Sequence, residues 1–178
     1  MRRRKSQSEP TPPDLHRAPM ISERLIVREA TRADAQMLEA TMAEADLDEG
    51  DRTADGARRF GAGLAEVPVW TATRAVCEKG TARIVGGVVL TEAGTESGAA
   101  SRIGWWLGTG SEHYAAELIA TVDERLRALG TGVVVMQVRA DDDDAIATAE
   151  AAGFRRGRSV QHTTQSGRNL AFWEYSRP

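Results

Sequence analysis

Apolar residues recur along this chain with two different periods, and the change of period separates predicted strands from predicted helices. Alternating positions or short apolar runs bounded by turn residues predict strands at 24–29, 69–76, 84–90, 102–107, 133–139, 159–164 and 170–175. Apolar residues at helical spacing predict helices at 31–42, 57–65, 112–129 and 145–152. The order indicates an α/β (α+β) protein in which antiparallel strands precede a β–α–β–α–β–β half.

Turn and capping residues support several of these boundaries. Thr31, followed three residues later by Asp34, has the spacing of a capping box at a helix start. Gly130 is well placed to end the helix at 112–129. Gly86 and Gly87 lie inside a predicted strand, which indicates a bulge or a close approach of another backbone.

Four consecutive aspartates at 141–144 resemble a metal cluster at first sight. Adjacent side chains cannot all point the same way, and the spacing is not that of a calcium-binding loop. Carboxylates in the first turn of a helix are stabilised by its dipole. We therefore expect these residues to cap the helix at 145–152, and we expect no metal site.

Composition narrows the class of protein. Residues 1–19 are rich in proline and charge, carry a net charge of +3, and are expected to be a disordered tail; residues 20–178 carry −6 and are expected to form one domain. A body this acidic is a poor general binder of nucleic acid. No apolar run approaches the ~20 residues of a membrane span. With Cys77 as the single cysteine, a reducing cytoplasmic setting is the simplest expectation.

The segment 103–117, Ile-Gly-Trp-Trp-Leu-Gly-Thr-Gly-Ser-Glu-His-Tyr-Ala-Ala-Glu, combines a strand, a short loop and a helix start. The first N–H groups of a helix have no internal acceptor and lie at the positive end of its dipole. Such a turn suits a phosphate or pyrophosphate. A structural loop between two core elements is the alternative, since the glycine spacing matches neither a dinucleotide fingerprint nor a Walker motif.

Six short motifs in a fixed order resemble the GNAT superfamily of acyl-coenzyme A N-acyltransferases, in particular its ribosomal-protein N-terminal acetyltransferase branch. They are Glu23-Arg-Leu-Ile-Val-Arg28, Thr31-Arg-Ala-Asp34, Ile103-Gly-Trp-Trp-Leu107, Tyr114-Ala-Ala-Glu117, Glu150-Ala-Ala-Gly-Phe154, and Gly167-Arg168 with Tyr175-Ser176. The resemblance implies a GNAT fold, a mixed and mostly antiparallel sheet of about seven strands with about four helices, splayed between the fourth and fifth strands. It also implies acetyl-coenzyme A as co-substrate.

The resemblance assigns cofactor contacts to particular positions. The fourth strand would hold the pantetheine arm through Trp105, Trp106 and Leu107, and the start of the penultimate helix would contribute Asp142. The loop and helix start that would hold the pyrophosphate comprise Gly108, Thr109, Gly110, Ser111, His113, Tyr114 and Ala115.

The loop departs from the family pattern. Where the family has an arginine and glycines before Tyr114, this chain has Gly110, Ser111, Glu112 and His113, and the loop is two residues shorter. A carboxylate there opposes a pyrophosphate, because two unit charges ~5 Å apart repel by roughly 3 kcal/mol at an effective dielectric of 20.

The positions expected to protonate the thiolate also differ. The family often has asparagine where this chain has Asp142, and tyrosine or serine where it has Ala149. The usual general acid is therefore missing.

Two functions follow as hypotheses. The first is acyl transfer to a small-molecule amine or a protein N-terminus, with Glu92, Glu96 and His162 as candidate bases because they are ionisable residues on segments that could border the cleft. The second is a non-catalytic GNAT-fold binding or regulatory module that has lost acetyl-coenzyme A binding. Neither involves a membrane or a specific nucleic acid. Open strand edges also permit a homodimer.

Overall fold

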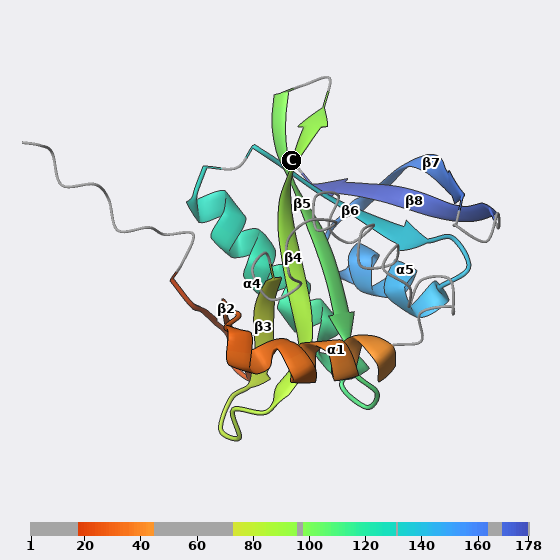
Figure 1. Cartoon of the computed structure of the whole chain (residues 1–178). Coiled ribbons are helices and arrows are strands. Elements are labelled where there is room, and N and C mark those ends of the chain that lie inside the picture. The colour runs from red at the N-terminus through yellow and green to blue at the C-terminus, as the bar shows by residue number, and fades with distance from the viewer. Residues whose placement is uncertain (1–17, 45–72, 96–97, 131, 164–168, 178) are drawn as a thin grey trace, which may run out of the picture.

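The strands of this protein form one eight-stranded sheet in the order β1-β2-β3-β4-β5-β6-β8-β7 (Figure 1). The computed structural model describes residues 18–44, 73–95, 98–130, 132–163 and 169–177. The strands are β1 (Met20–Ile21), β2 (Leu25–Glu29), β3 (Thr73–Glu78), β4 (Ile84–Thr95), β5 (Gly98–Leu107), β6 (Val133–Arg139), β7 (Arg155–Thr163) and β8 (Asn169–Arg177). All neighbours are antiparallel except β5 and β6, which are parallel.

The expected mixed, mostly antiparallel sheet is thus confirmed, with one strand more than predicted. The extra strand is β1, a two-residue pairing with β2 that is too short to give a periodic signal in the sequence. Of the predicted strand at 69–76, residues 69–72 lie outside the described residues, and the remainder belongs to β3.

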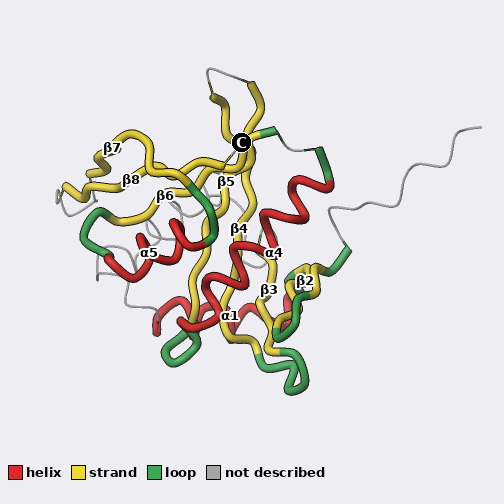
Figure 2. The backbone as a smooth tube through the Cα atoms, turned by 180° about the vertical axis from the view of Figure 1, so that it is seen from behind, coloured by secondary structure: helices red, strands yellow, loops and turns green. Residues whose placement is uncertain are grey.

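Three α-helices cover the sheet in the described part of the chain: α1 (Ala35–Glu44), α4 (Ala115–Ala128) and α5 (Asp143–Ala151). Figures 1 and 2 show α1 on one face and both α4 and α5 on the other. A single 3₁₀ turn precedes α1 (Arg32–Asp34) and another precedes α4 (Glu112–Tyr114). The predicted helix at 57–65 lies outside the described residues. None of the described helices has the length and apolar content that a bilayer crossing requires.

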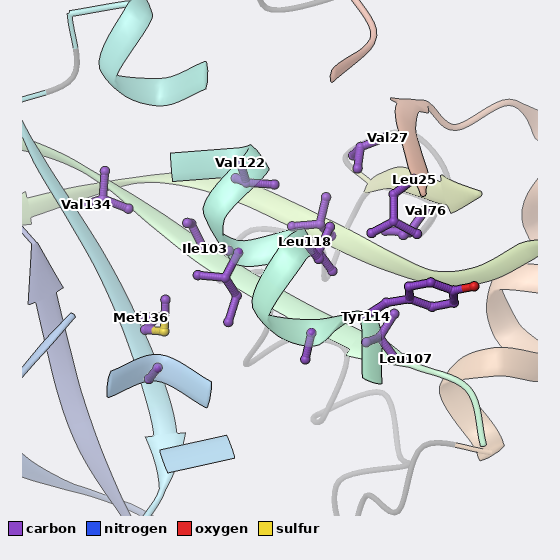
Figure 3. Close-up of a cluster of buried hydrophobic side chains, with 14 of the residues drawn as sticks. Leu25, Val27, Val76, Ile103, Leu107, Tyr114, Leu118, Val122, Val134 and Met136 are labelled. Carbon is purple, nitrogen blue, oxygen red and sulfur yellow. The ribbon is translucent and has the colours of Figure 1, made fainter. Parts of the chain in front are cut away.

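The larger hydrophobic core lies between α4 and the sheet (Figure 3). Leu118, Ile119 and Val122 of α4 are fully buried there against strand residues such as Val88 and Met136. This is the apolar stripe that the helical spacing of the sequence predicted. A smaller cluster on the opposite face joins Leu38 of α1 to Trp106 of β5 and further residues of β2, β3 and β4.

Gly86 and Gly87 bring β4 and β5 into unusually close contact, as the sequence suggested. A Cβ on Gly86 would overlap the carbonyl oxygen of Trp106, and one on Gly87 would overlap the Trp106 indole. The pairing of β3 with β4 shifts register at this point, between Val76 and Cys77. Only glycine at position 87 therefore leaves room for the Trp106 indole.

The predicted capping box at Thr31 and Asp34 is confirmed and extended by an arginine. Asp34 accepts the Thr31 N–H at 2.7 Å and the Thr31 hydroxyl at 2.8 Å. Arg28 of β2 donates to both carboxylate oxygens of Asp34 at 2.8 Å. The Arg28 guanidinium, together with the Thr31 hydrogen bonds, holds the pKa of Asp34 well below its usual range.

Replacing Gly86 with alanine is expected to destabilise the protein by about 2 kcal/mol, because the backbone of β5 cannot move away from the new methyl group without strain. Chemical denaturation measures the change. Gly132→Ala is the control, since a Cβ at Gly132 meets no atom within 4 Å. Equal stability of the two variants would contradict the close approach of β4 and β5.

Asp34→Asn is expected to remove about 2 kcal/mol of stability at neutral pH. Because the folded-state pKa of Asp34 is depressed, its contribution is full above the unfolded value of about 4 and is lost as the pH falls through the lower folded value. The unfolding free energies of the two proteins should therefore converge in acid. Glu39→Gln, an exposed change on α1, serves as control. A constant gap from neutral to acid pH would disprove the ionic origin.

Candidate functional site

Strands β5 and β6 part midway along their length. Their parallel pairing begins at Ala100 and Val133 and ends at Ile103 and Met136. Beyond that point β5 continues to pair with β4 as far as Leu107, while β6 continues with β8 as far as Arg139. The sheet therefore opens between these two strands, which confirms the expected splay (Figure 1).

The open edge of β5 carries unpaired backbone groups. Gly108 donates its N–H to the carbonyl of Val85 at 2.8 Å, so it faces β4. Backbone groups alternate between the two edges of a strand, hence Trp106 also faces β4. Trp105 and Leu107 direct their N–H and C=O groups toward the opening, where no pairing with β6 is present among the described residues.

The side chains of the three residues expected to hold pantetheine lie on different faces of the sheet. Leu107 is buried in the core under α4, and the half-buried Trp105 packs against that core. Trp106 lies on the α1 side, where its indole N–H donates to the Thr41 hydroxyl at 3.2 Å. Trp106 therefore anchors β5 to α1, and only the backbones of Trp105 and Leu107 are directed at the opening.

The loop after β5 is attached to the end of α1. Gly108 is buried there, and a Cβ on it would lie 2.9 Å from a carboxylate oxygen of Glu44. The Thr109 hydroxyl donates to the Glu44 carbonyl at 3.1 Å. Gly110 adopts a φ of 81°, in the left-handed region that favours glycine, and Ser111 is buried and donates its N–H to the Gly108 carbonyl.

Glu112 places its carboxylate on this loop. Its Oε1 accepts the N–H of Gly110 at 3.0 Å, so one amide of this turn already has an anionic acceptor. Glu112 and the adjacent His113 are exposed, and their N–H groups belong to the first helical turn, which has no internal acceptors. The His113 ring lies 4.0 Å from that of Tyr114.

A partly buried carboxylate fixes the start of α4. Glu117 accepts hydrogen bonds from the Ser22 hydroxyl at 2.6 Å and from the N–H and Nε of Arg24 at 2.8 and 2.7 Å. Burial by itself would raise the pKa of Glu117, but these donors lower it below the ordinary value. The Tyr114 hydroxyl donates to Glu78 at 2.7 Å, while Arg24 stacks 4.9 Å above its ring. The helix start is thereby held against β2 and β3.

The contacts of Glu117 with Ser22 and Arg24 were not predicted from the sequence. Glu117 and Arg24 are 93 residues apart, and their only shared signal was membership of two motifs that resemble the same family. A carboxylate on the buried side of an amphipathic helix is an indication that a distant cation pairs with it.

Asp142 caps α5 on the other side of the opening. Its Oδ1 accepts the Ala145 N–H at 2.9 Å, and Asp143 and Asp144 follow in the first turn, as predicted from the aspartate run. Since β5 and β6 are parallel, their carboxyl ends share one edge of the sheet, and Asp142 and the Gly108 loop flank the opening there. No group of His, Cys, Asp and Glu suited to a metal occurs in the described residues.

The residue aligned with the usual general acid is fully buried. Ala149 lies in the core beneath α5 and has no ionisable group. Of the candidate bases, Glu92 lies on β4 opposite Ser101 and His162 lies on β7 opposite Leu170, while Glu96 lies outside the described residues. The strand order places β8 between β7 and β6, so His162 is two strands from the β6 side of the opening.

Comparison of sequences and comparison of structures give different results. No protein-family model matches the sequence, and no curated protein matches it in sequence. Three solved structures illustrate the structural matches. A GNAT-family acetyltransferase from Bacillus anthracis superposes with a TM-score of 0.71 at 15% identity, covering 90% of this chain and 98% of the other.

A ribosomal-protein-S5-alanine acetyltransferase from Vibrio fischeri gives a TM-score of 0.61 at 15% identity, with 90% and 96% covered. A chimeric spermidine N-acetyltransferase from Vibrio cholerae gives a TM-score of 0.64 at 17% identity, and the match covers 85% of this chain and 93% of the other. At these identities the likeness concerns the fold. Together with the opened sheet and the helix start beside it, these matches show that this chain has the GNAT acetyltransferase fold.

Proposed function

We propose that this protein is an N-acyltransferase that moves an acetyl or other acyl group from a coenzyme A thioester to an amine. The observation that carries the proposal is the unpaired edge of β5 at Trp105 and Leu107, next to the first turn that leads into α4. An extended, amide-containing ligand can pair with such an edge as an added strand would. A phosphate-bearing ligand can contact the helix start.

The residues present fit the two ends of acetyl-coenzyme A to different degrees. The backbone of Trp105 and Leu107 fits the pantetheine amides. The first turn at Ser111, His113, Tyr114 and Ala115 and the loop residues Gly108, Thr109 and Gly110 would receive the pyrophosphate, with Asp142 across the opening. Glu112 opposes that anion, so the loop must release the Gly110 N–H, at a cost in affinity.

The thioester would supply an activated carbonyl carbon for direct attack by the amine. The N–H of Trp105 or Leu107 would stabilise the developing oxyanion. A base, for which Glu92, Glu96 and His162 remain the candidates, would take a proton from the ammonium group. Because Ala149 offers no acid, water would return a proton to the departing thiolate.

The solved relatives are consistent with an amine acceptor. Two of them are named for a ribosomal-protein alanine and for spermidine, and a small-molecule amine or a protein N-terminus is accordingly the acceptor class we propose. We also propose a cytoplasmic location, with which the buried free thiol of Cys77 is consistent. A homodimer is proposed as well.

One observation favours the second candidate, a binding or regulatory module without acyl transfer. The Glu112 carboxylate on the Gly110 N–H is an internal substitute for a phosphate oxygen. If this contact persists in the presence of cofactor, the helix start is closed and the fold serves another role.

Calorimetric titration with acetyl-coenzyme A distinguishes the two. We expect Glu112→Gln to bind about tenfold more tightly than the native chain, because removal of the charge relieves a repulsion that solvent exposure weakens but does not abolish. Glu124→Gln, an exposed change further along α4, should bind as the native protein does.

Two further results would be decisive in the same titration. Glu112→Gly combined with His113→Gly restores glycines at both altered positions, and binding by this variant alone would identify the native chain as a module with a closed site. No tightening in Glu112→Gln would show that the pyrophosphate does not bind at this turn.

The transfer reaction is tested by thiol release from acetyl-coenzyme A in the presence of small amines, polyamines and N-terminal peptides. We expect turnover with at least one class. Absence of thiol release from all of them by a protein that binds the cofactor would contradict the enzymatic function.

A further inference from the structure

Arg102 of β5 has a buried guanidinium nitrogen that makes no hydrogen bond. Its Nε is inaccessible to solvent and has no partner among the described residues. Arg125 also has a buried Nε without an acceptor, but its Nη2 donates to the Ala18 carbonyl at 3.4 Å. Arg28 and Arg139 donate to the carboxylates of Asp34 and Asp141. A buried donor of a charged group without an acceptor is unfavourable, and such groups are normally paired.

The position of Arg102 relates this unmet donor to the opening of the sheet. Arg102 pairs with Val135 of β6, one step before the last paired residues, Ile103 and Met136. The opening therefore begins immediately beyond Arg102. Gly104 is two residues away, about 7 Å along the strand. The first backbone N–H and C=O directed into the opening belong to Trp105.

Alternation along β5 fixes the face on which Arg102 lies. Ile103 and Leu107 belong to the core under α4, whereas Trp106 belongs to the cluster with α1. Arg102 is an even number of residues from Trp106, so it lies on the α1 face. On that face the residue between them is Gly104, which contributes no side chain.

The opposite face is closed to an incoming acceptor at this point. Ile103, Met136 and Ala149 are buried there in one continuous core with the partly buried Ile146 of α5. An amine that attacks a thioester held along β5 must then approach from the α1 face. Its path passes Gly104 and brings it beside Arg102.

We propose that Arg102 binds an acid group of the acceptor, so that the substrates are small amines that also carry a carboxylate or a phosphonate group. This inference rests on the proposed acyltransferase function. The planar guanidinium presents paired N–H donors that match both acid groups. The same positive charge disfavours polyamines and gives no benefit to an uncharged amine.

The test compares acceptors that differ only in the acid group. L-Alanine and 4-aminobutyrate are paired with L-alaninamide and 4-aminobutyramide, and aminomethylphosphonate, spermidine and an alanyl peptide amide complete the panel. Thiol release gives kcat and KM separately. We expect the acids to exceed their amides at least tenfold in kcat/KM, with aminomethylphosphonate showing whether phosphonate serves as well as carboxylate.

Variants connect the preference to the residue. Arg102→Met should raise KM for the acids so that their kcat/KM falls about 100-fold, while values for the amides stay within about twofold. Arg102→Lys, which keeps the charge but loses the paired donors, should restore part of the difference and guards against a folding defect in the methionine variant. Arg155→Met removes an exposed arginine from edge strand β7 and should change nothing.

A binding measurement without catalysis completes the test. N-acetyl-L-alanine should bind to the native protein more tightly than N-acetyl-L-alaninamide in a calorimetric titration, and Arg102→Met should abolish the difference. Turnover of amides, peptide or spermidine in preference to the acids would overturn the role of Arg102 and leave the acyltransferase function intact. No turnover of any acceptor by a protein that binds acetyl-coenzyme A would contradict both the role of Arg102 and the proposed acyltransferase function.

Discussion

The parting of β5 from β6 is the constraint on which the rest of this structure depends. Beyond their shared pairing, each of the two strands is held by a different neighbour. Gly86 and Gly87 let β4 follow β5 closely as far as Leu107, and β8 follows β6 to Arg139. Since neighbouring strands of a sheet twist relative to one another, two strands that remain bound to separate partners diverge once their mutual pairing stops. The opening and the unpaired amides of β5 are thus consequences of pairing elsewhere in the sheet.

The charges at the mouth of this opening are unusual for a site that is proposed to bind an anion. Acidic side chains lie at both helix starts that flank it: Asp142 is the N-cap of α5, and Glu112 lies in the turn before α4. Both accept a backbone N–H. At α5 this is ordinary capping. At α4 the carboxylate lies on the turn where the pyrophosphate is proposed to bind, so the backbone geometry favours the cofactor while the side chain opposes it. We expect the affinity for the proposed cofactor to depend on the difference between these two contributions.

The local sequence pattern was sufficient to predict most helices and strands and some residues of the candidate site. The stripe on α4, the cap at Asp142 and the close approach at Gly86 all follow from spacing or from the chemistry of single residues. Contacts between distant segments could not be predicted in this way. Nothing near Glu117 indicates that Arg24 will pair with it, and nothing near Arg102 indicates that its Nε will lack an acceptor, because both facts depend on how strands and helices pack. The catalytic base is unassigned for the same reason.

Amide hydrogen exchange, resolved at single residues, tests the central claim that the open edge of β5 is the binding surface for the thioester co-substrate. In the protein alone, Trp106 should exchange slowly because its N–H faces β4, whereas Trp105 and Leu107 should exchange fast. Acetyl-coenzyme A should slow Trp105 and Leu107 and leave Trp106 unchanged. Slow exchange of Trp105 and Leu107 without ligand, or fast exchange in the presence of a saturating concentration, would contradict the account.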